Sequence, residues 1–180
     1  VRSHLAGLQS VTDAWPSDEQ FTEAWMTGHA YSALNNGRIV YILSKLSETY
    51  RNSKTEQLKV TGQLTVEHLM PQAWVAHWLL SDGSRGINNP WSVPADDPQA
   101  LATRARSAIV QTFGNLTLIT GSLNSAISNG AWATKRAAIE ANSLLPINLQ
   151  LRSAETWDEV AIERRGRDLL CRALKLWPRG

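Results

Sequence analysis

The sequence contains a single cysteine, Cys171, among its 180 residues. One cysteine excludes an internal disulfide and a zinc site of the CxxC type, so we expect no structural zinc. No apolar run approaches the roughly 20 residues that cross a membrane. The start, Val1 to His4, has neither an initiator methionine nor the apolar core of a secretion signal. We therefore expect a soluble, cytoplasmic domain without membrane contact, taken from a longer protein.

Neither sign of charge dominates the chain, because 18 Lys and Arg residues stand against 16 Asp and Glu residues, for a net charge of +2. This balance permits a nucleic-acid partner but requires any basic surface to be local. The sequence also lacks a GxxxxGK[ST] loop, which excludes a nucleotide site of that type. With 43% apolar residues the chain can bury a core, so we expect a globular domain.

The chain divides into three zones that together form one domain, namely 1–60, 61–142 and 143–180. The first zone predicts two helices. Ser17 and Gln20 form a capping box before the first, and Asn36–Gly37 precede the second. Apolar residues recur at the 3.6 period of buried stripes. These are Phe21, Ala24 and Trp25 in the first helix, and Ile39, Ile42, Leu43, Leu46 and Tyr50 in the second.

Two short strands are expected in the middle zone, at Leu64–His68 and Asn115–Ile119, because β-branched and apolar residues alternate there. They should pair as a two-stranded ribbon. The roughly 46 residues between them are too many for a tight hairpin, and Ser81–Gly86 with Asn88, Asn89 and Pro90 mark a polar excursion. Residues 98–113 predict a helix with Arg104 and Arg106 off its apolar face. That face comprises Leu101, Ala105, Ala108, Ile109 and Thr112.

The chain after the second strand is expected to be helical again. Residues 122–128 and 129–142 predict one bent helix or two consecutive helices, with Asn129–Gly130 as the bend. In the closing zone, Thr156 and Glu159 predict a second capping box. The helix that follows has an apolar face of Ile162, Gly166, Leu169, Ala173, Leu176 and Trp177, whereas Arg164, Arg165, Arg167 and Arg172 fall mostly on the other side, where a solvated face is the ordinary reading.

Chemically useful side chains meet at the ends of the two strands. Glu67 and His68 end the first strand, and Asn115 and Asn124 lie nine positions apart on and after the second. A carboxylate and an amide oxygen suit a hard divalent cation, while an imidazole can deprotonate water, so the set matches a one-metal phosphodiesterase. Because side chains alternate along a strand, Glu67 and His68 converge only if the strand ends there.

The same residues carry a family resemblance. Glu67-His68-Leu69-Met70-Pro71, Gly114-Asn115-Leu116-Thr117-Leu118, Leu123-Asn124, Asn129 and Lys135 resemble the HNH (His-Me finger, ββα-metal) nucleases. More narrowly, they resemble the C-terminal nuclease domain of GmrSD-type modification-dependent restriction enzymes. Asn36-Gly37-Arg38, Trp157, Ile162, Arg165 and Trp177-Pro178 are similar to the flanking helices of that subfamily.

The resemblance implies a mostly helical α+β fold, with a ββα-metal core, a long insertion between the two strands and helices on either side. It implies His68 as the general base, with Glu67 and Asn124 as ligands of Mg²⁺, for which Mn²⁺ should substitute. Asn115 would brace the loop around the base, and Lys135 would hold a phosphate oxygen. The alternatives from the residues alone are a helix cap for Asn124, a turn for Asn115 and a solvated side chain for Lys135.

The implied activity is nicking of double-stranded DNA in a bacterial defence system against phage. Contacts to DNA are expected from Asn129, Lys135, Arg136, Arg104 and Arg106, and base stacking from Trp74 or Trp91. The implied partner is an N-terminal nucleotide-hydrolysing domain that senses modified DNA. The competing interpretation is a non-catalytic module on an HNH scaffold that binds DNA or a protein, and a third is a nuclease that acts on RNA or on any DNA.

Overall fold

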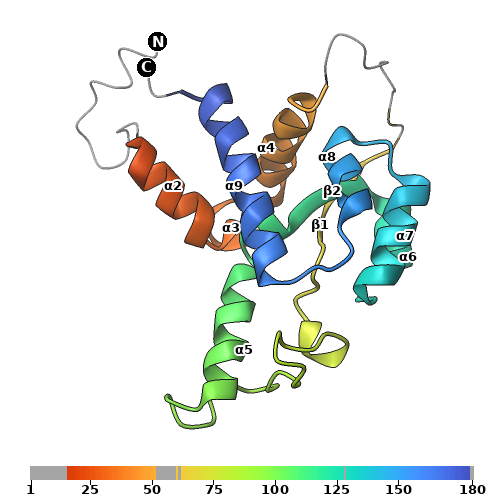
Figure 1. The fold of residues 1–180 in the computed structure, drawn as a ribbon. Helices are drawn as coiled ribbons and strands as arrows, with labels where there is room; N and C mark the ends of the chain where they lie inside the picture. Colours follow the sequence, from red (N-terminus) through yellow and green to blue (C-terminus); the bar gives the residue numbers. More distant parts are fainter. Residues whose placement is uncertain (1–15, 52–59, 61, 128, 179–180) are drawn as a thin grey trace.

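The computed structural model describes residues 16–51, 60, 62–127 and 129–178. Residues 1–15 and 52–59 of the predicted N-terminal flank, together with Ser128, lie outside the described residues. The described chain is a mostly helical α+β domain with one two-stranded antiparallel sheet (Figure 1). Its strands are β1 (Leu64–His68) and β2 (Leu116–Thr120). Its α-helices are α2 (Asp18–Thr27), α3 (Ala30–Ala33), α4 (Asn36–Glu48), α5 (Pro98–Ile109), α6 (Gly121–Ile127), α7 (Trp132–Asn142), α8 (Pro146–Leu149) and α9 (Glu159–Leu176). Three short 3-10 helices are η1 (Trp74–Ala76), η2 (Phe113–Asn115) and η3 (Gln150–Ser153).

The first two predicted helices are confirmed. The capping box before α2 is complete, because Gln20 N donates to Ser17 Oγ at 3.1 Å and Ser17 N donates to Gln20 Oε1 at 2.8 Å. Asn36 and Gly37, which were predicted to precede the second helix, are the first two residues of α4, since Asn35 is its cap and accepts from Arg38 N. In its predicted stripe Ile39, Leu43 and Leu46 are fully inaccessible to solvent, whereas Ile42 is half-buried and Tyr50 is half-buried beyond the end of the helix.

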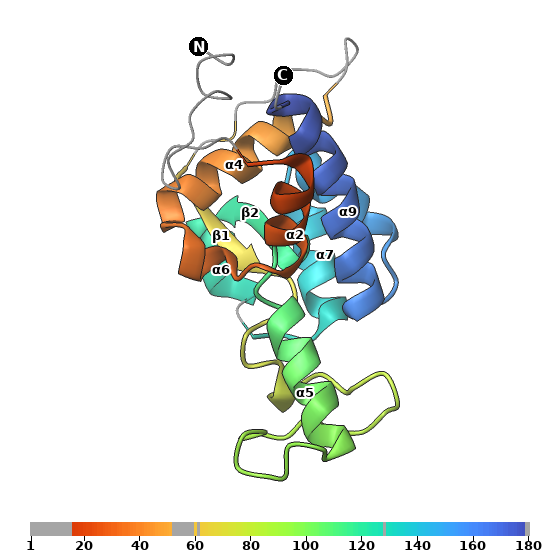
Figure 2. The same cartoon turned by 90° about the vertical axis from the view of Figure 1, so that its left-hand side faces the viewer.

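The predicted ribbon is also confirmed, and β1 has the expected bounds. Strand β2 starts one residue late because Asn115 ends the 3-10 turn η2. The register pairs Glu67 with Thr117 and His68 with Leu116. Figure 2 shows the ribbon between α4 and α6, which both contact it.

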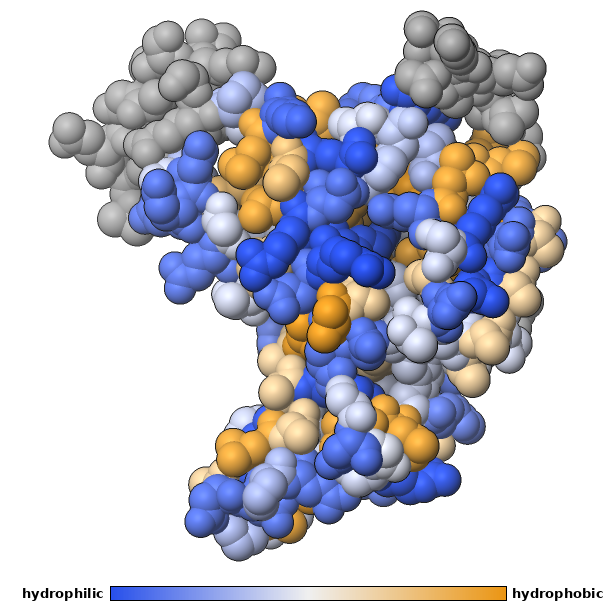
Figure 3. Space-filling view, in the orientation of Figure 1, coloured by the Kyte–Doolittle hydropathy of each residue, from blue (hydrophilic) through white to orange (hydrophobic). Residues whose placement is uncertain are grey.

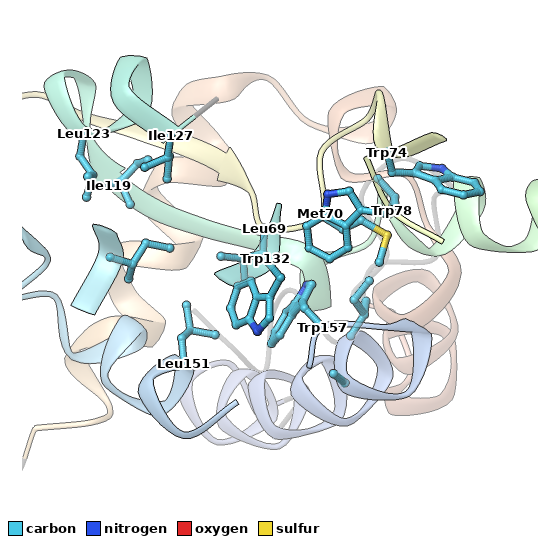
Figure 4. Packing of buried hydrophobic residues seen from close by; sticks show 14 of the residues in the cluster. Leu69, Met70, Trp74, Trp78, Ile119, Leu123, Ile127, Trp132, Leu151 and Trp157 are labelled. Atoms are coloured by element: carbon cyan, nitrogen blue, oxygen red, sulfur yellow. The ribbon is translucent and has the colours of Figure 1, made fainter. Parts of the chain in front are cut away.

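Two apolar clusters fill the domain, one on each face of the ribbon. Val66, Leu116 and Leu118 pack with α4 and the second half of α9. Ile119 faces the other cluster, in which the rings of Trp132 and Trp157 stack with centroids 4.9 Å apart (Figure 4). Within the described residues, no helix has the length and apolarity needed to span a bilayer.

The long connection between the strands, residues 69–112, forms a projection that we call the arm. It stands out as a separate lobe in the space-filling view (Figure 3). It contains η1, an isolated bridge between Leu79 and Arg85, and α5, which is capped by Asp97. The arm leaves and rejoins the domain at one place, because Leu69 N donates to Asn115 O at 2.9 Å.

The apolar face predicted for α5 is wrong. Leu101 and Ala105 are exposed, whereas Ala100, Thr103 and Arg106 are buried. The physical reason is Arg106, which donates to both carboxylate oxygens of Glu159 and to Leu79 O. A buried charged side chain therefore turns a polar stripe of the helix inward.

The C-terminal elements agree with the prediction in part. Residues after β2 form two separate helices, α6 and α7, as one of the two alternatives predicted. The cap of α9 is Asp158, whose Oδ1 accepts from Ala161 N at 2.8 Å. The predicted cap Thr156 is wrong, because the Glu159 side chain that would complete its capping box accepts from Arg106 instead. Most of the α9 face is buried as predicted, but Arg165 is buried with it.

Candidate functional site

His68 is the last residue of β1, and its half-buried imidazole is contacted by three side chains. Tyr31 of α3 stacks on the ring, with centroids 5.4 Å apart and planes 19° apart. Gln111 Oε1 lies 3.3 Å and Gln72 Nε2 3.4 Å from His68 Nε2. Burial lowers the pKa of His68 to about 4; the charge of Lys135 acts in the same direction, and the Gln111 hydrogen bond opposes it. The ring is therefore neutral at pH 7 and retains a basic nitrogen.

Glu67 precedes His68 and projects to the opposite face of the ribbon, as strand alternation requires. Glu67 is 9% exposed and forms an ion pair with Lys135 of α7. The Lys135 side chain is completely buried. Lys135 Nζ also donates to His68 O at 2.7 Å. Burial raises the pKa of Glu67 and lowers the pKa of Lys135, because burial disfavours both charged forms, and the ion pair offsets part of each shift.

Asn115 braces the start of the arm with a side chain that is fully buried. Its Oδ1 accepts from Met70 N at 2.8 Å and from Trp157 Nε1 at 3.0 Å. Its Nδ2 donates to Met70 O at 2.8 Å and to Val110 O at 2.9 Å. All four bonding positions of this amide are thus used, and the residues that follow His68 are held in place.

Asn124 lies on α6, the helix that follows β2. Its Nδ2 donates to Thr65 Oγ1 at 3.1 Å. Thr65 and Glu67 are two positions apart on β1 and share a face, so the Glu67 carboxylate and the Asn124 amide lie on the same side of the ribbon. Within the described residues no group of three or more His, Cys, Asp or Glu side chains gathers. On this face Glu67 offers a carboxylate and Asn124 an amide oxygen.

The predicted DNA contacts lie in different environments. Arg106 is buried and paired, as described above, so we leave it out of any DNA surface. Arg104 is held in the arm by the carbonyls of Pro90, Pro94 and Ala95, and its guanidinium lies 4.9 Å from the ring centroid of Trp91. Asn129 is exposed between α6 and α7, and Arg136 is half-buried and donates to Ala154 O.

The two tryptophans proposed for stacking also differ. Trp74 is 1% exposed and belongs to the core cluster, whereas Trp91 is 77% exposed in the arm. A free aromatic face is needed to stack on a base. Only Trp91 of the pair therefore presents one in this structure.

Sequence reasoning missed the partners of the histidine. Tyr31, Gln72 and Gln111 touch the ring but carry no motif that would single them out. It placed Arg165 in the flanking helix but missed its role, which is to donate to Gly114 O at 2.8 Å and Leu116 O at 2.7 Å and so hold the turn that contains Asn115. Burial lowers the pKa of Arg165 to about 10, so it stays charged at neutral pH.

These features define an α+β domain in which an imidazole, a carboxylate, an ammonium and two amides lie around a short two-stranded ribbon. The chain matches the family model described as GmrSD restriction endonucleases, C-terminal domain, over residues 15–171, and it belongs to that family. It is thus a restriction endonuclease domain, with DNA as the substrate of its class. No curated protein and no solved structure matches the chain.

Proposed function

We propose that the domain is an HNH-type nuclease that hydrolyses one strand of DNA, with His68 as the general base. The observation that carries the proposal is that β1 ends in Glu67 and His68, with a buried carboxylate on one face of the ribbon and a neutral imidazole on the other. A neutral imidazole can take a proton from water. One such site attacks one phosphodiester, so nicking is the expected activity of a single domain.

The donor chemistry on the other face of β1 fits a hard divalent cation. Glu67 and Asn124 would hold Mg²⁺, or Mn²⁺ in its place, because carboxylate and amide oxygens are the ligands these ions prefer. When bound, the ion would neutralise charge on the scissile phosphate and stabilise the departing 3′ oxygen. Lys135 keeps Glu67 oriented through their ion pair.

The remaining residues position the base. Asn115 fixes Met70 and thereby the chain that leaves His68. His68 accepts a proton from the attacking water, and the products carry a 5′ phosphate and a 3′ hydroxyl. In the full-length protein, we propose, a nucleotide-hydrolysing domain that senses modified DNA precedes this one and controls cutting, in defence against phage.

The test is conversion of supercoiled plasmid to open circles with Mg²⁺, Mn²⁺ or EDTA. His68→Ala should lower the rate by roughly 10² or more, because the base is lost. His77→Ala is the matched control, since His77 is exposed in the arm, and it should cut like the unmodified chain. Unchanged cleavage by His68→Ala would exclude this histidine as the base.

A non-catalytic module that binds DNA is the second candidate, and one observation favours it. Lys135 brings a buried positive charge to the carboxylate that a cation would need, and like charges repel. A folded chain that binds DNA equally with EDTA and with Mg²⁺, and that nicks under neither condition alone or within the full-length protein, would establish the module.

A further inference from the structure

Trp91 displays an indole of the kind that this fold otherwise buries. The residue is 77% exposed. Five of the other tryptophans in the described part of the chain are at most 8% exposed, namely Trp25, Trp74, Trp78, Trp132 and Trp157. Exposed tryptophan is enriched where a protein meets a partner, because its large ring is apolar and its N–H is polar. A single exposed side chain is ordinary on its own, so the way in which this one is held matters.

The chain holds the indole at the centre of a closed turn. Ser92 N donates to Asn89 O at 3.2 Å, and Ser92 Oγ donates to the same oxygen at 2.8 Å. Pro90 and Trp91 are the two central residues of this turn, and proline favours the first of these positions because its ring fixes φ. The backbone that carries the indole is therefore already ordered, so a partner that binds the ring need not order it.

Arg104 of α5 holds the same turn. Its guanidinium donates to the carbonyls of Pro90, Pro94 and Ala95 at 3.1 to 3.3 Å. It also lies 4.9 Å from the centroid of the Trp91 ring. Among the described residues no carboxylate forms an ion pair with Arg104. The indole is thus fixed by its own turn and by a guanidinium whose hydrogen bonds go to backbone carbonyls.

A nucleic-acid strand fits this surface by stacking more than by charge. Every nucleobase offers a π-face to an aromatic side chain, and the family to which the chain belongs acts on DNA. The charges around the ring are mixed, since Asp96 is exposed and Asp97 caps α5 through Ala100 N. A surface that binds phosphates needs an excess of positive charge. The indole is therefore the group that carries the contact.

The indole lies within reach of DNA bound at the proposed site. Arg104 precedes Gln111 by seven residues, and α5 covers most of that span as it leads from the arm to the ribbon (Figure 2). Seven residues of helix advance about 10 Å. Gln111 Oε1 lies 3.3 Å from His68 Nε2. Base steps in duplex DNA are about 3.4 Å apart, so roughly three steps separate the indole from the site along one substrate.

We infer that Trp91 stacks on a nucleobase of the DNA substrate, roughly three base steps from the scissile phosphate, and that Arg104 positions the indole for this contact. The inference rests on the proposed nuclease function, which defines the substrate. A base inside a duplex is covered by its neighbours, so it must leave them to stack on Trp91. The arm therefore prefers DNA with a mismatched base, because such a base costs least to displace.

Binding of DNA in EDTA tests the contact without cleavage. The probes are two duplexes of one sequence, one fully paired and one with a single mismatch, and the unmodified chain should bind the mismatched duplex more tightly. Trp91→Ala and Trp91→Leu should each lower the affinity for that duplex by roughly 10-fold and remove the preference, whereas Trp91→Phe should keep most of both. The matched control is Tyr41→Ala, since Tyr41 is a 57% exposed aromatic residue of α4, outside the arm. It should change neither.

Several results would overturn the inference. They are equal affinity of the unmodified chain for the two duplexes, binding of neither duplex, and full affinity in Trp91→Ala. The salt dependence of binding gives a further check, because stacking releases no counterions. The unmodified chain and Trp91→Ala should show the same slope of log affinity against log salt concentration, and a shallower slope in the variant would overturn stacking as the contact.

Arg104→Met tests the positioning role. It should lower the affinity for the mismatched duplex about as much as Trp91→Ala does. The double variant should bind no more weakly than either single variant, because the arginine acts through the indole. Losses of affinity that add in the double variant would overturn this role. The Trp91 variants should unfold at the same temperature as the unmodified chain, since the side chain they change is exposed.

The inference and the proposed function fail separately, because binding is measured without metal and nicking with it. A chain that prefers the mismatched duplex through Trp91 but never nicks DNA would contradict the nuclease proposal alone. In a chain that does nick, Trp91→Ala should raise KM for a mismatched substrate with little change in kcat, as expected for a residue that binds DNA away from the reacting atoms. An unchanged KM would contradict the stacking contact alone.

Discussion

Lys135 and Glu67 form an ion pair in which the ammonium is completely buried and the carboxylate side chain is 11% exposed. The pair joins α7 to β1, and its second hydrogen bond, to His68 O, reaches the backbone of the proposed base. The same contact therefore joins α7 to β1 and reaches the proposed site.

Lys135→Met should destabilise the domain by about 3–5 kcal/mol, because it leaves the Glu67 carboxylate buried without its counter-charge. Urea unfolding at neutral pH measures the change. The double variant Glu67→Leu with Lys135→Met should recover most of the lost stability, since neither charge is then buried alone, yet it should not nick DNA. A single variant that loses less than about 1 kcal/mol would show that the pair is dispensable for folding.

Asn115→Asp should cost at least about 3 kcal/mol of unfolding free energy. The change is isosteric, but it places a carboxylate oxygen against Met70 O and Val110 O where an N–H group now donates. Protonation of the new carboxyl restores a donor, so the variant should regain stability relative to the unmodified chain as pH falls. Asn129→Asp, an isosteric change at an exposed site, is the control and should lie within about 0.5 kcal/mol.

Gly114→Ala should destabilise the domain by roughly 1–3 kcal/mol or more, because no side chain fits there. A Cβ at this position would lie 2.2 Å from Ile162 O and 3.1 Å from Gly166 N, which belong to the backbone of α9. Gly121→Ala is the matched control, since a Cβ there meets nothing within 4 Å. Thermal unfolding of both variants makes the comparison, and equal midpoints would contradict the close approach of the turn to α9.

The domain should lose stability in alkaline solution as Tyr50 ionises. Burial raises the pKa of Tyr50 to about 12, and its hydrogen bond to Asp168 at 2.5 Å acts in the same direction. A raised pKa in the folded state contributes stability that is complete below the unfolded value of 10.0 and is lost as pH rises to about 12. Unfolding measured across this range should show the loss, and Tyr50→Phe should remove the part due to this group. A tyrosinate absorbance titration without a late-ionising tyrosine would contradict the shift.

The strands and the first cap were predictable because their signals are local. Alternation of β-branched and apolar residues located β1 to the residue, and Ser17 with Gln20 located the start of α2. The one-residue error at β2 arises because Asn115 belongs to a 3-10 turn, whose buried side chain bonds to residues far away in sequence.

Buried charges were not predictable from periodicity, which assigns charged residues to solvent. Arg106 bonds to a partner 53 residues away and Lys135 to one 68 residues away. Nothing near either residue in sequence indicates that partner. The same limit applies to the site, where the motif located His68 but not Tyr31, which reaches the imidazole only through the tertiary fold.

The two strands of the ribbon are joined by the whole arm and not by a turn, so Met70 and Asn115 meet across 45 residues of chain. Closing so long a loop costs conformational entropy before any ribbon contact forms. The strands therefore cannot pair starting from a local turn, and we expect the helices that enclose them to form first. We therefore expect that a chain emerging from synthesis lacks an ordered ribbon, and with it the proposed site, until its last helix, α9, has docked against the turn that precedes β2.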